Sequence, residues 1–174
     1  KGVGRHPKTG KKKGGIKVHT VIHANEGVPS DIKFTSAATN DSFMLKPSTL
    51  NKGDIMAMDR AYIDYEKFEE LTQRGVVYVT KLKKSLKYAI NEDIMYQTPN
   101  GLMEVRLQYV TFSKQVKGGE TIIHHARIVT YVDVKKRKLV SLLTNDLASD
   151  PDEIIAIYRR RWEIELLFKQ IKQN

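Results

Sequence analysis

The sequence predicts an α/β protein with an antiparallel β insertion ahead of a long C-terminal helix. Residues 55–58 and 76–80 are short apolar runs typical of buried strands, and residues 65–74 between them suit a helix that ends at a glycine. This spacing favours a parallel pair joined by a crossover. Residues 85–144 contain four extended segments separated by turn sequences, as in an antiparallel meander. No glycine or proline interrupts the chain from Ile154 onward, which predicts one uninterrupted helix.

The N-terminal part is expected to begin with a tail and continue as a hairpin. Residues 1–15 are rich in lysine and glycine and contain no acidic residue, which predicts a flexible basic tail. A contact with a DNA backbone that orders this tail on binding is compatible with that interpretation. Residues 16–24 alternate in polarity and residues 30–36 are strand-like, so the two are expected to pair across the turn between them.

Composition limits the classes of partner and of cofactor. The 174 residues include 30 Lys and Arg against 20 Asp and Glu, and this net charge of +10 favours a polyanionic partner. The chain contains no cysteine, which excludes disulfides and thiolate metal sites within it and is compatible with a reducing cytosol. No apolar run approaches the length of a membrane span, so we expect a cytoplasmic protein with no membrane partner.

A polar stripe on the C-terminal helix is the most informative feature of the sequence. Tyr158, Arg161, Glu165 and Lys172 are three, four and seven residues apart, which places them within roughly 60° of one another on a helix. Apolar residues flank the stripe on both sides, so it is expected to face the protein or something held there. An ordinary Arg161–Glu165 pair at i,i+4 is the alternative. The remaining positions form the expected outer face, namely Arg159, Arg160, Glu163 and Gln170.

This spacing resembles the C-terminal signature of a group of bacterial insertion-sequence transposases with a DDE active site. The tract from Arg161 to Glu165, Arg-Trp-Glu-Ile-Glu, strengthens the resemblance, as does the Phe-Lys pair that follows it. The segment Met58-Asp59-Arg60-Ala61-Tyr62 is similar to the region around the family's second catalytic aspartate. Residues 15–19 and 142–146 also resemble family segments in the same order, so the likeness covers nearly the whole chain.

The resemblance implies a fold, a chemistry and a set of site residues. It implies an RNase H-like core in residues 16–84, a β-rich insertion in 85–145 and a C-terminal catalytic helix in 146–174. It also implies a carboxylate site that holds two divalent ions, Mg²⁺ or in its place Mn²⁺, for phosphoryl transfer at transposon ends and target DNA. The catalytic and metal-binding residues would be Asp59 and Glu165. The DNA-binding residues would be Tyr158, Arg161 and Lys172. Double-stranded DNA is the implied partner, bound by a homodimer of the full-length protein in the bacterial nucleoid.

One departure from the family concerns its first catalytic aspartate. In the family that residue lies on a strand ahead of the hairpin, and this chain has no aspartate before Asp31. Neither Asp31 nor Asp41 matches the family position. We therefore expect the first strand of the core to be missing, the sheet to have an open edge or gap, and the chain as given to be unable to nick or join DNA.

Two other functions remain open from the sequence. An RNase H-like nuclease or junction resolvase would use the same ions, but would yield no strand-transfer product. A non-enzymatic DNA-binding module would be insensitive to Asp59→Asn and to Glu165→Gln.

Overall fold

The computed structural model describes most of the chain from residue 52 onward and the strands before it. The described residues are 2–5, 12–23, 29–36, 52–58, 65–99 and 103–173.

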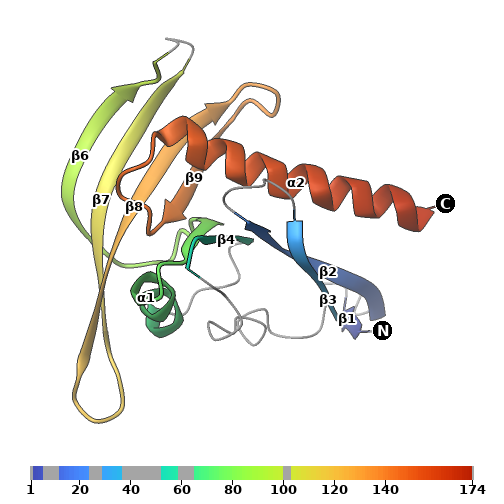
Figure 1. Cartoon of the computed structure of the whole chain (residues 1–174), viewed down its shortest axis with the longest axis horizontal. Helices are drawn as coiled ribbons and strands as arrows, with labels where there is room; N and C mark the ends of the chain where they lie inside the picture. Colours follow the sequence, from blue (N-terminus) through green and yellow to red (C-terminus); the bar gives the residue numbers. More distant parts are fainter. Residues whose placement is uncertain are drawn as a thin grey trace.

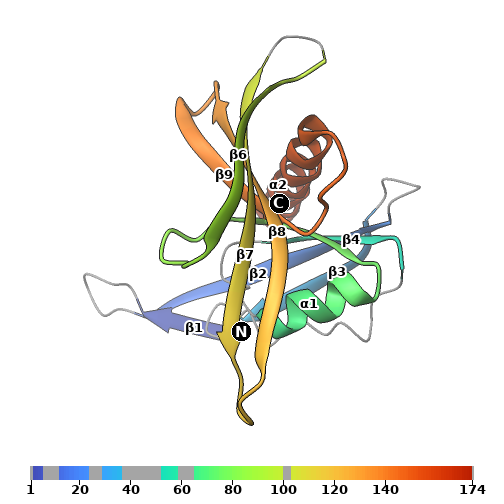
Figure 2. The same cartoon turned by 90° about the vertical axis from the view of Figure 1, so that its left-hand side faces the viewer.

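A single mixed sheet organises the described residues (Figures 1 and 2). Its order is β1-β2-β4-β5-β9-β8-β7-β6, with β3 paired to β2. The strands are β1 Gly2–Arg5, β2 Lys12–His23, β3 Pro29–Ser36, β4 Asp54–Met58, β5 Val77–Lys81, β6 Ala89–Gln97, β7 Glu104–Gln115, β8 Thr121–Asp133 and β9 Lys138–Thr144. The two helices are α1 Tyr65–Gln73 and α2 Pro151–Gln173.

The predicted crossover between two buried parallel strands is confirmed. β4 pairs in parallel with β5, and α1 lies between them in the chain. The helix stops where the sequence indicates, because Gly75 takes a φ of 74° and the amide of Val76 bonds back to the carbonyl of Leu71 at 2.9 Å. The turn returns the chain directly into β5.

The four strands of residues 89–144 continue the same sheet. β6, β7, β8 and β9 pair antiparallel in sequence order, and β9 pairs with β5 of the core. The sequence indicates a strand over residues 87–91 at the start of the insertion, but β6 extends to Gln97, six residues further. Nearly all its side chains are exposed at the sheet edge, so it lacks the apolar alternation that would have marked its length.

The N-terminal residues differ from the expected flexible tail. β1 pairs antiparallel with the start of β2, from Gly2 opposite Gly15 to Arg5 opposite Lys12. Composition alone suggested a tail, but ladder hydrogen bonds between backbones need no apolar side chains. The predicted β2–β3 hairpin is present. We expected a gap or an open edge beside the core, whereas β2 bonds directly to β4, from Thr20 opposite Ala57 to His23 opposite Asp54.

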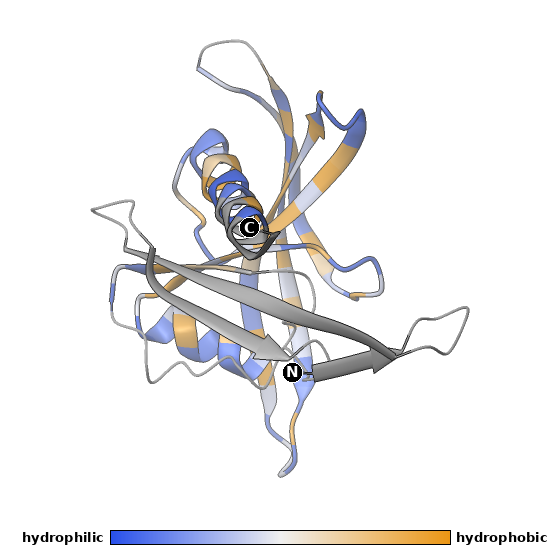
Figure 3. Cartoon of the chain, turned by 90° about the vertical axis from the view of Figure 1, so that its right-hand side faces the viewer, coloured by the Kyte–Doolittle hydropathy of each residue, from blue (hydrophilic) through white to orange (hydrophobic). Residues whose placement is uncertain are grey.

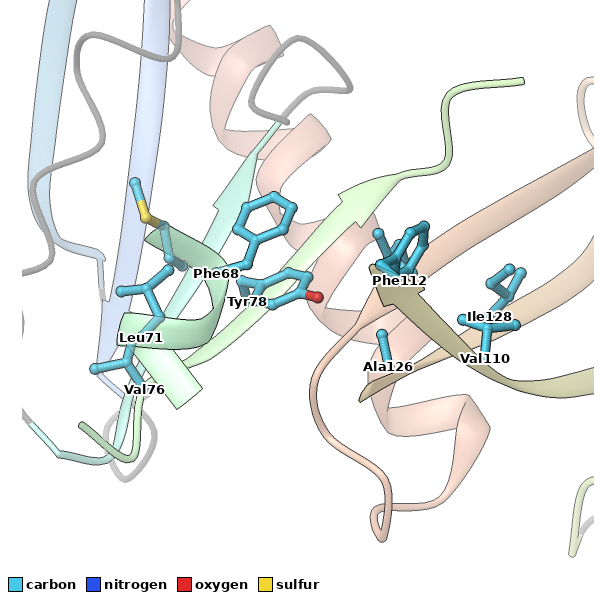
Figure 4. Close-up of a cluster of buried hydrophobic side chains, with 10 residues drawn as sticks. Phe68, Leu71, Val76, Tyr78, Val110, Phe112, Ala126 and Ile128 are labelled. Atoms are coloured by element: carbon cyan, nitrogen blue, oxygen red, sulfur yellow. The ribbon is translucent and has the colours of Figure 1, made fainter. Parts of the chain in front are cut away.

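The core lies on both faces of the sheet, one helix to each face. On one face, Phe68 and Leu71 of α1 pack with Tyr78 of β5, Phe112 of β7 and Ile128 of β8 (Figure 4). All five side chains are fully buried. Burial of each such side chain contributes about 1.5–3 kcal/mol to stability.

On the opposite face, α2 packs across the central strands. Ile154 and Ile155 join Val79 of β5, Leu142 of β9 and Tyr131 of β8 in a second cluster. Tyr78 and Val79 are adjacent on β5 and therefore point to opposite faces. None of the helices in the described part of the chain has the length and hydrophobicity needed to cross a membrane.

Candidate active site

The loop between β9 and α2 is a compact polar turn that sets where α2 begins. The Asp146 carboxylate accepts hydrogen bonds from the amides of Ala148 and Ser149, at 3.0 and 2.9 Å, and from the Ser149 hydroxyl at 2.5 Å. Burial disfavours its charge, but these hydrogen bonds outweigh that effect and lower the pKa of Asp146 below its ordinary value. The buried Arg127 donates to the Ser149 carbonyl at 2.8 Å. The start of α2 is thus fixed to β8.

Asn145 ties the same loop to the core. Its side-chain oxygen accepts the amide of Tyr78 at 2.9 Å, and its nitrogen donates to the Val76 carbonyl at 2.8 Å. The nitrogen also donates to the Thr72 hydroxyl at 2.9 Å, at the end of α1. One amide group therefore connects α1, β5 and the approach to α2. The position of α2 relative to the crossover is set by these three bonds together with the second apolar cluster.

The orientation predicted for α2 is confirmed where its side chains are described. Arg161 is only 5% exposed and Tyr158 is half-buried against the second cluster. The expected outer residues are all exposed, namely Arg159, Arg160, Glu163 and Gln170. A cation therefore lies on the buried side of the helix, where an ordinary surface pair would not place it.

Tyr158 and Arg161 form a stacked pair on that inner side. The guanidinium carbon of Arg161 lies 5.0 Å from the centroid of the Tyr158 ring, within cation–π range. Its Nη2 also donates to the Tyr158 hydroxyl at 3.4 Å. Because that oxygen already accepts from the arginine, the hydroxyl hydrogen is left to donate elsewhere.

The other predicted site residues lie outside the described side chains. β4 ends at Met58, so Asp59 follows immediately at the carboxyl end of a central strand, but it is itself outside the described residues. Glu165 and Lys172 belong to the α2 backbone, while their side chains are not described. α2 packs against β4 and β5. The site that these residues would form remains a prediction, and among the described residues no group of three His, Asp or Glu side chains could hold a metal.

Comparison with known families decides the class of protein. A family model described as a transposase DDE domain matches residues 2–174. The chain belongs to the transposase DDE domain family.

Curated proteins similar to this domain are also named as transposases. The chain is 26% identical to a putative transposase, y4zB, of Sinorhizobium fredii, over 92% of the chain and 45% of the relative. It is 20% identical to a probable transposase of the element IS5377 from Geobacillus stearothermophilus, over 93% of the chain and 42% of the relative. A putative transposase of the element IS4SA from Synechocystis is 24% identical, over 91% and 44%. The chain spans less than half of the length of these relatives.

A buried polar relay in this transposase domain was not predicted from the sequence. His124 of β8 is fully buried, with Nδ1 2.7 Å from the Glu69 carboxylate and Nε2 2.5 Å from the Tyr78 hydroxyl. An ionised carboxylate only accepts, so Nδ1 carries the proton and Nε2 accepts from the tyrosine. Burial lowers the pKa of His124, against the opposing effect of Glu69, and burial raises that of Tyr78.

The relay has the carboxylate–histidine–hydroxyl order of a catalytic triad, but its hydroxyl is not accessible to a substrate. Tyr78 is fully buried, so its hydroxyl cannot reach a substrate. The relay therefore joins α1, β5 and β8 as a structural link. One feature of the sequence could have indicated the relay. His124 alternates with apolar residues on one face of the strand, namely Ile122, Ala126 and Ile128, and a polar side chain on an apolar face needs hydrogen-bond partners.

Proposed function

We propose that this chain is part of the catalytic domain of a bacterial insertion-sequence transposase of the Tyr-Arg-Glu-Lys group. Its reaction would be metal-dependent phosphoryl transfer, which cuts transposon ends and joins the new 3′-OH to target DNA. The observation that carries the proposal is the buried Arg161, stacked on Tyr158 on the inner side of α2. These are the first two positions of the signature, and they lie on the side of α2 that packs against the sheet, in which β4 ends directly before Asp59 in the sequence.

Asp59 and Glu165 are the proposed metal ligands and catalytic carboxylates. Asp59 directly follows a central strand, and Glu165 lies one helical turn beyond Arg161 on the same side of α2. Hard carboxylate oxygens suit Mg²⁺, with Mn²⁺ as a substitute. Divalent ions held there would activate the attacking oxygen and stabilise the leaving one. The protein's part is to hold α2, which carries Glu165, in place against the sheet through the hydrogen bonds of Asn145 and Asp146.

Tyr158, Arg161 and Lys172 are the proposed DNA contacts beside these carboxylates. Arg161 holds the Tyr158 hydroxyl as an acceptor, which leaves its hydrogen for a phosphate oxygen. The guanidinium would also place positive charge behind that contact. Lys172 is two turns beyond Glu165 on the same stripe, where an ammonium can meet the next part of the strand.

The chain supplies only two of the three carboxylates that such a site uses. It has no aspartate ahead of Asp31 that matches the family's first position. We therefore propose that these residues alone bind DNA but neither nick nor join it, and that the longer protein acts as a homodimer on paired ends. We also propose that the chain consists of a core, a β-rich insertion and a C-terminal catalytic helix. The strands of the insertion extend the sheet of the core.

The test is cleavage by a protein that adds the family's first strand ahead of residue 1, so that β1 and β2 stay intact. We expect Mg²⁺-dependent nicking of a duplex that carries the transposon end, followed by strand transfer. Asp59→Asn and Glu165→Gln should each lower the rate by roughly 10²–10³-fold or more, as loss of a preorganised group in a transition state does. Glu120→Gln, an exposed carboxylate in the β7–β8 turn of the insertion, is the matched control and should retain activity. Cleavage that survives both active-site substitutions would overturn the proposal.

A further inference from the structure

The turn between β8 and β9 carries a concentration of positive charge that the proposed active site does not use. Lys135, Lys136, Arg137 and Lys138 are consecutive, and all four are exposed. Figure 3 shows this turn as a hydrophilic cap on an apolar hairpin. Exposed charges of one sign repel one another, so such a cluster gains stability when a polyanion neutralises it.

The turn has a defined shape. The Asp133 carboxylate accepts the amide of Lys136 at 3.1 Å, which closes the loop at its base. Arg137 takes a φ of 49°, in the left-handed region, and Lys138 pairs with Asp133 as the next strand begins. The cationic side chains are therefore presented on a closed hairpin end, and less conformational freedom is lost on binding than in a flexible tail.

Apolar side chains flank the charges on one face of the hairpin. Val132 and Leu139 are cross-strand partners and are 51% and 70% exposed, and Val134 is 80% exposed. No described residue covers them. A surface of cations beside exposed methyl groups suits a ligand with both phosphates and apolar sugar faces.

The base of the hairpin is held against α2. Tyr131 lies opposite Val140 across the two strands, and both pack with Ile155 in the second cluster. The guanidinium of Arg159 lies 5.7 Å from the centroid of the Tyr131 ring. Lys135, the first cation of the turn, is four residues beyond Tyr131, or about 13 Å along an extended chain. That distance corresponds to about four phosphates at a spacing of about 3.4 Å along one strand of duplex DNA.

From these observations we propose that the β8–β9 turn binds the phosphate backbone of duplex DNA. The turn is about four phosphates away from Tyr131, which packs in the same cluster as Tyr158, so the contact lies on DNA beside the part held at Tyr158. The turn would contact DNA that flanks the active site, while the reacting phosphodiester lies at the proposed carboxylates. The inference rests on the proposed function for the identity of the polyanion.

The experiment compares two triple variants of the chain in binding to a generic DNA duplex over a range of salt concentrations. The first is Lys135→Gln, Lys136→Gln and Lys138→Gln, which spares Arg137 because of its left-handed backbone. The matched control is Lys84→Gln, Lys87→Gln and Lys117→Gln, exposed lysines between β5 and β6 and in the β7–β8 turn. Each variant removes three charges, so both lower the net charge equally.

We expect the turn variant to bind roughly tenfold or more weakly at about 0.1 M salt, and its log–log salt slope to fall by about 2–3. The control should change either quantity by far less. Replacing the same three turn lysines with arginine should preserve binding. Equal losses in the two triple variants, no loss in the turn variant, or no DNA binding by the unaltered chain would each overturn the inference. Cleavage of transposon ends is measured separately, so that failure here leaves the test of the active-site carboxylates unaffected.

Discussion

The two faces of the central sheet bury polar groups in opposite ways. On the α1 face, Tyr78, His124 and Glu69 satisfy one another in a closed relay. On the α2 face, Arg161 is buried against a tyrosine that is only half-buried. One face uses its hydrogen-bonding capacity internally, while on the other the Tyr158 hydroxyl accepts from Arg161 and keeps its own hydrogen for a further bond.

Under the proposed function, this difference separates polar residues that hold the fold from those that would contact DNA. A closed relay gains nothing from a ligand, because its donors and acceptors are already matched. An arginine–tyrosine pair with a spare donor gains a further bond when a phosphate arrives. Substitutions on the α1 face should therefore change stability, and those on the α2 face should change DNA binding.

The largest effect is expected from Phe68→Ala on the α1 face. The ring is fully buried and stacks on Tyr78 at 4.2 Å, so its loss should cost about 3–5 kcal/mol of unfolding free energy. Urea unfolding followed by circular dichroism measures this directly. The DNA affinity of the remaining folded protein should be unchanged, and a selective loss of that affinity would break the division between the faces.

Asn145→Ala should have the next largest effect, because it disconnects α2 from the core. The amide of Tyr78 and the carbonyl of Val76 would lose their partner, at a cost of about 2–4 kcal/mol. Asn91→Ala is the control, since this asparagine makes an exposed bond to Thr111. Its effect on urea unfolding should stay within about 0.5 kcal/mol. Similar small effects from both changes would show that the loop does not anchor α2.

A pair of matched substitutions compares the two faces with the same chemical change. Tyr78→Phe leaves the buried Nε2 of His124 without its donor and should cost about 1–3 kcal/mol of stability, with DNA affinity retained. Tyr158→Phe should change stability by less than about 1 kcal/mol. It should weaken DNA binding about tenfold, the value of a bond to a charged group. The reverse pattern would exchange the roles given to the two faces.

The smallest effect concerns pH. Burial lowers the pKa of His124 in the folded state below its ordinary value of 6.5, so the unfolded chain binds a proton more readily. The contribution to stability is complete above pH 6.5 and is lost as the pH falls toward the folded-state pKa. His124→Gln should flatten this part of the stability profile. His125→Gln, an exposed neighbour, should leave it in place.

The local elements were predictable because their signals are local. Apolar runs, a glycine at the end of α1 and the unbroken sequence of α2 are contained within short windows. The inward side of Arg161 also followed from helical spacing. The relay could not be predicted, because Glu69 and Tyr78 are 55 and 46 residues from His124 in the sequence. β1 was missed for a different reason, since backbone pairing among lysines and glycines leaves no hydrophobic pattern.

The proposed active site requires Asp59 and Glu165 to converge on the inner side of α2. The chain has no cysteine, so pairs of introduced thiols report proximity without interference. We would treat Asp59→Cys/Glu165→Cys with a bifunctional thiol reagent that spans about 10 Å, the reach of a site with two ions about 3.5–4 Å apart. Asp59→Cys/Glu163→Cys is the control, because Glu163 lies on the exposed outer face. We expect rapid intramolecular cross-linking of the first pair and little of the second. Cross-linking of the control pair alone, or of neither pair, would contradict the proposed active site.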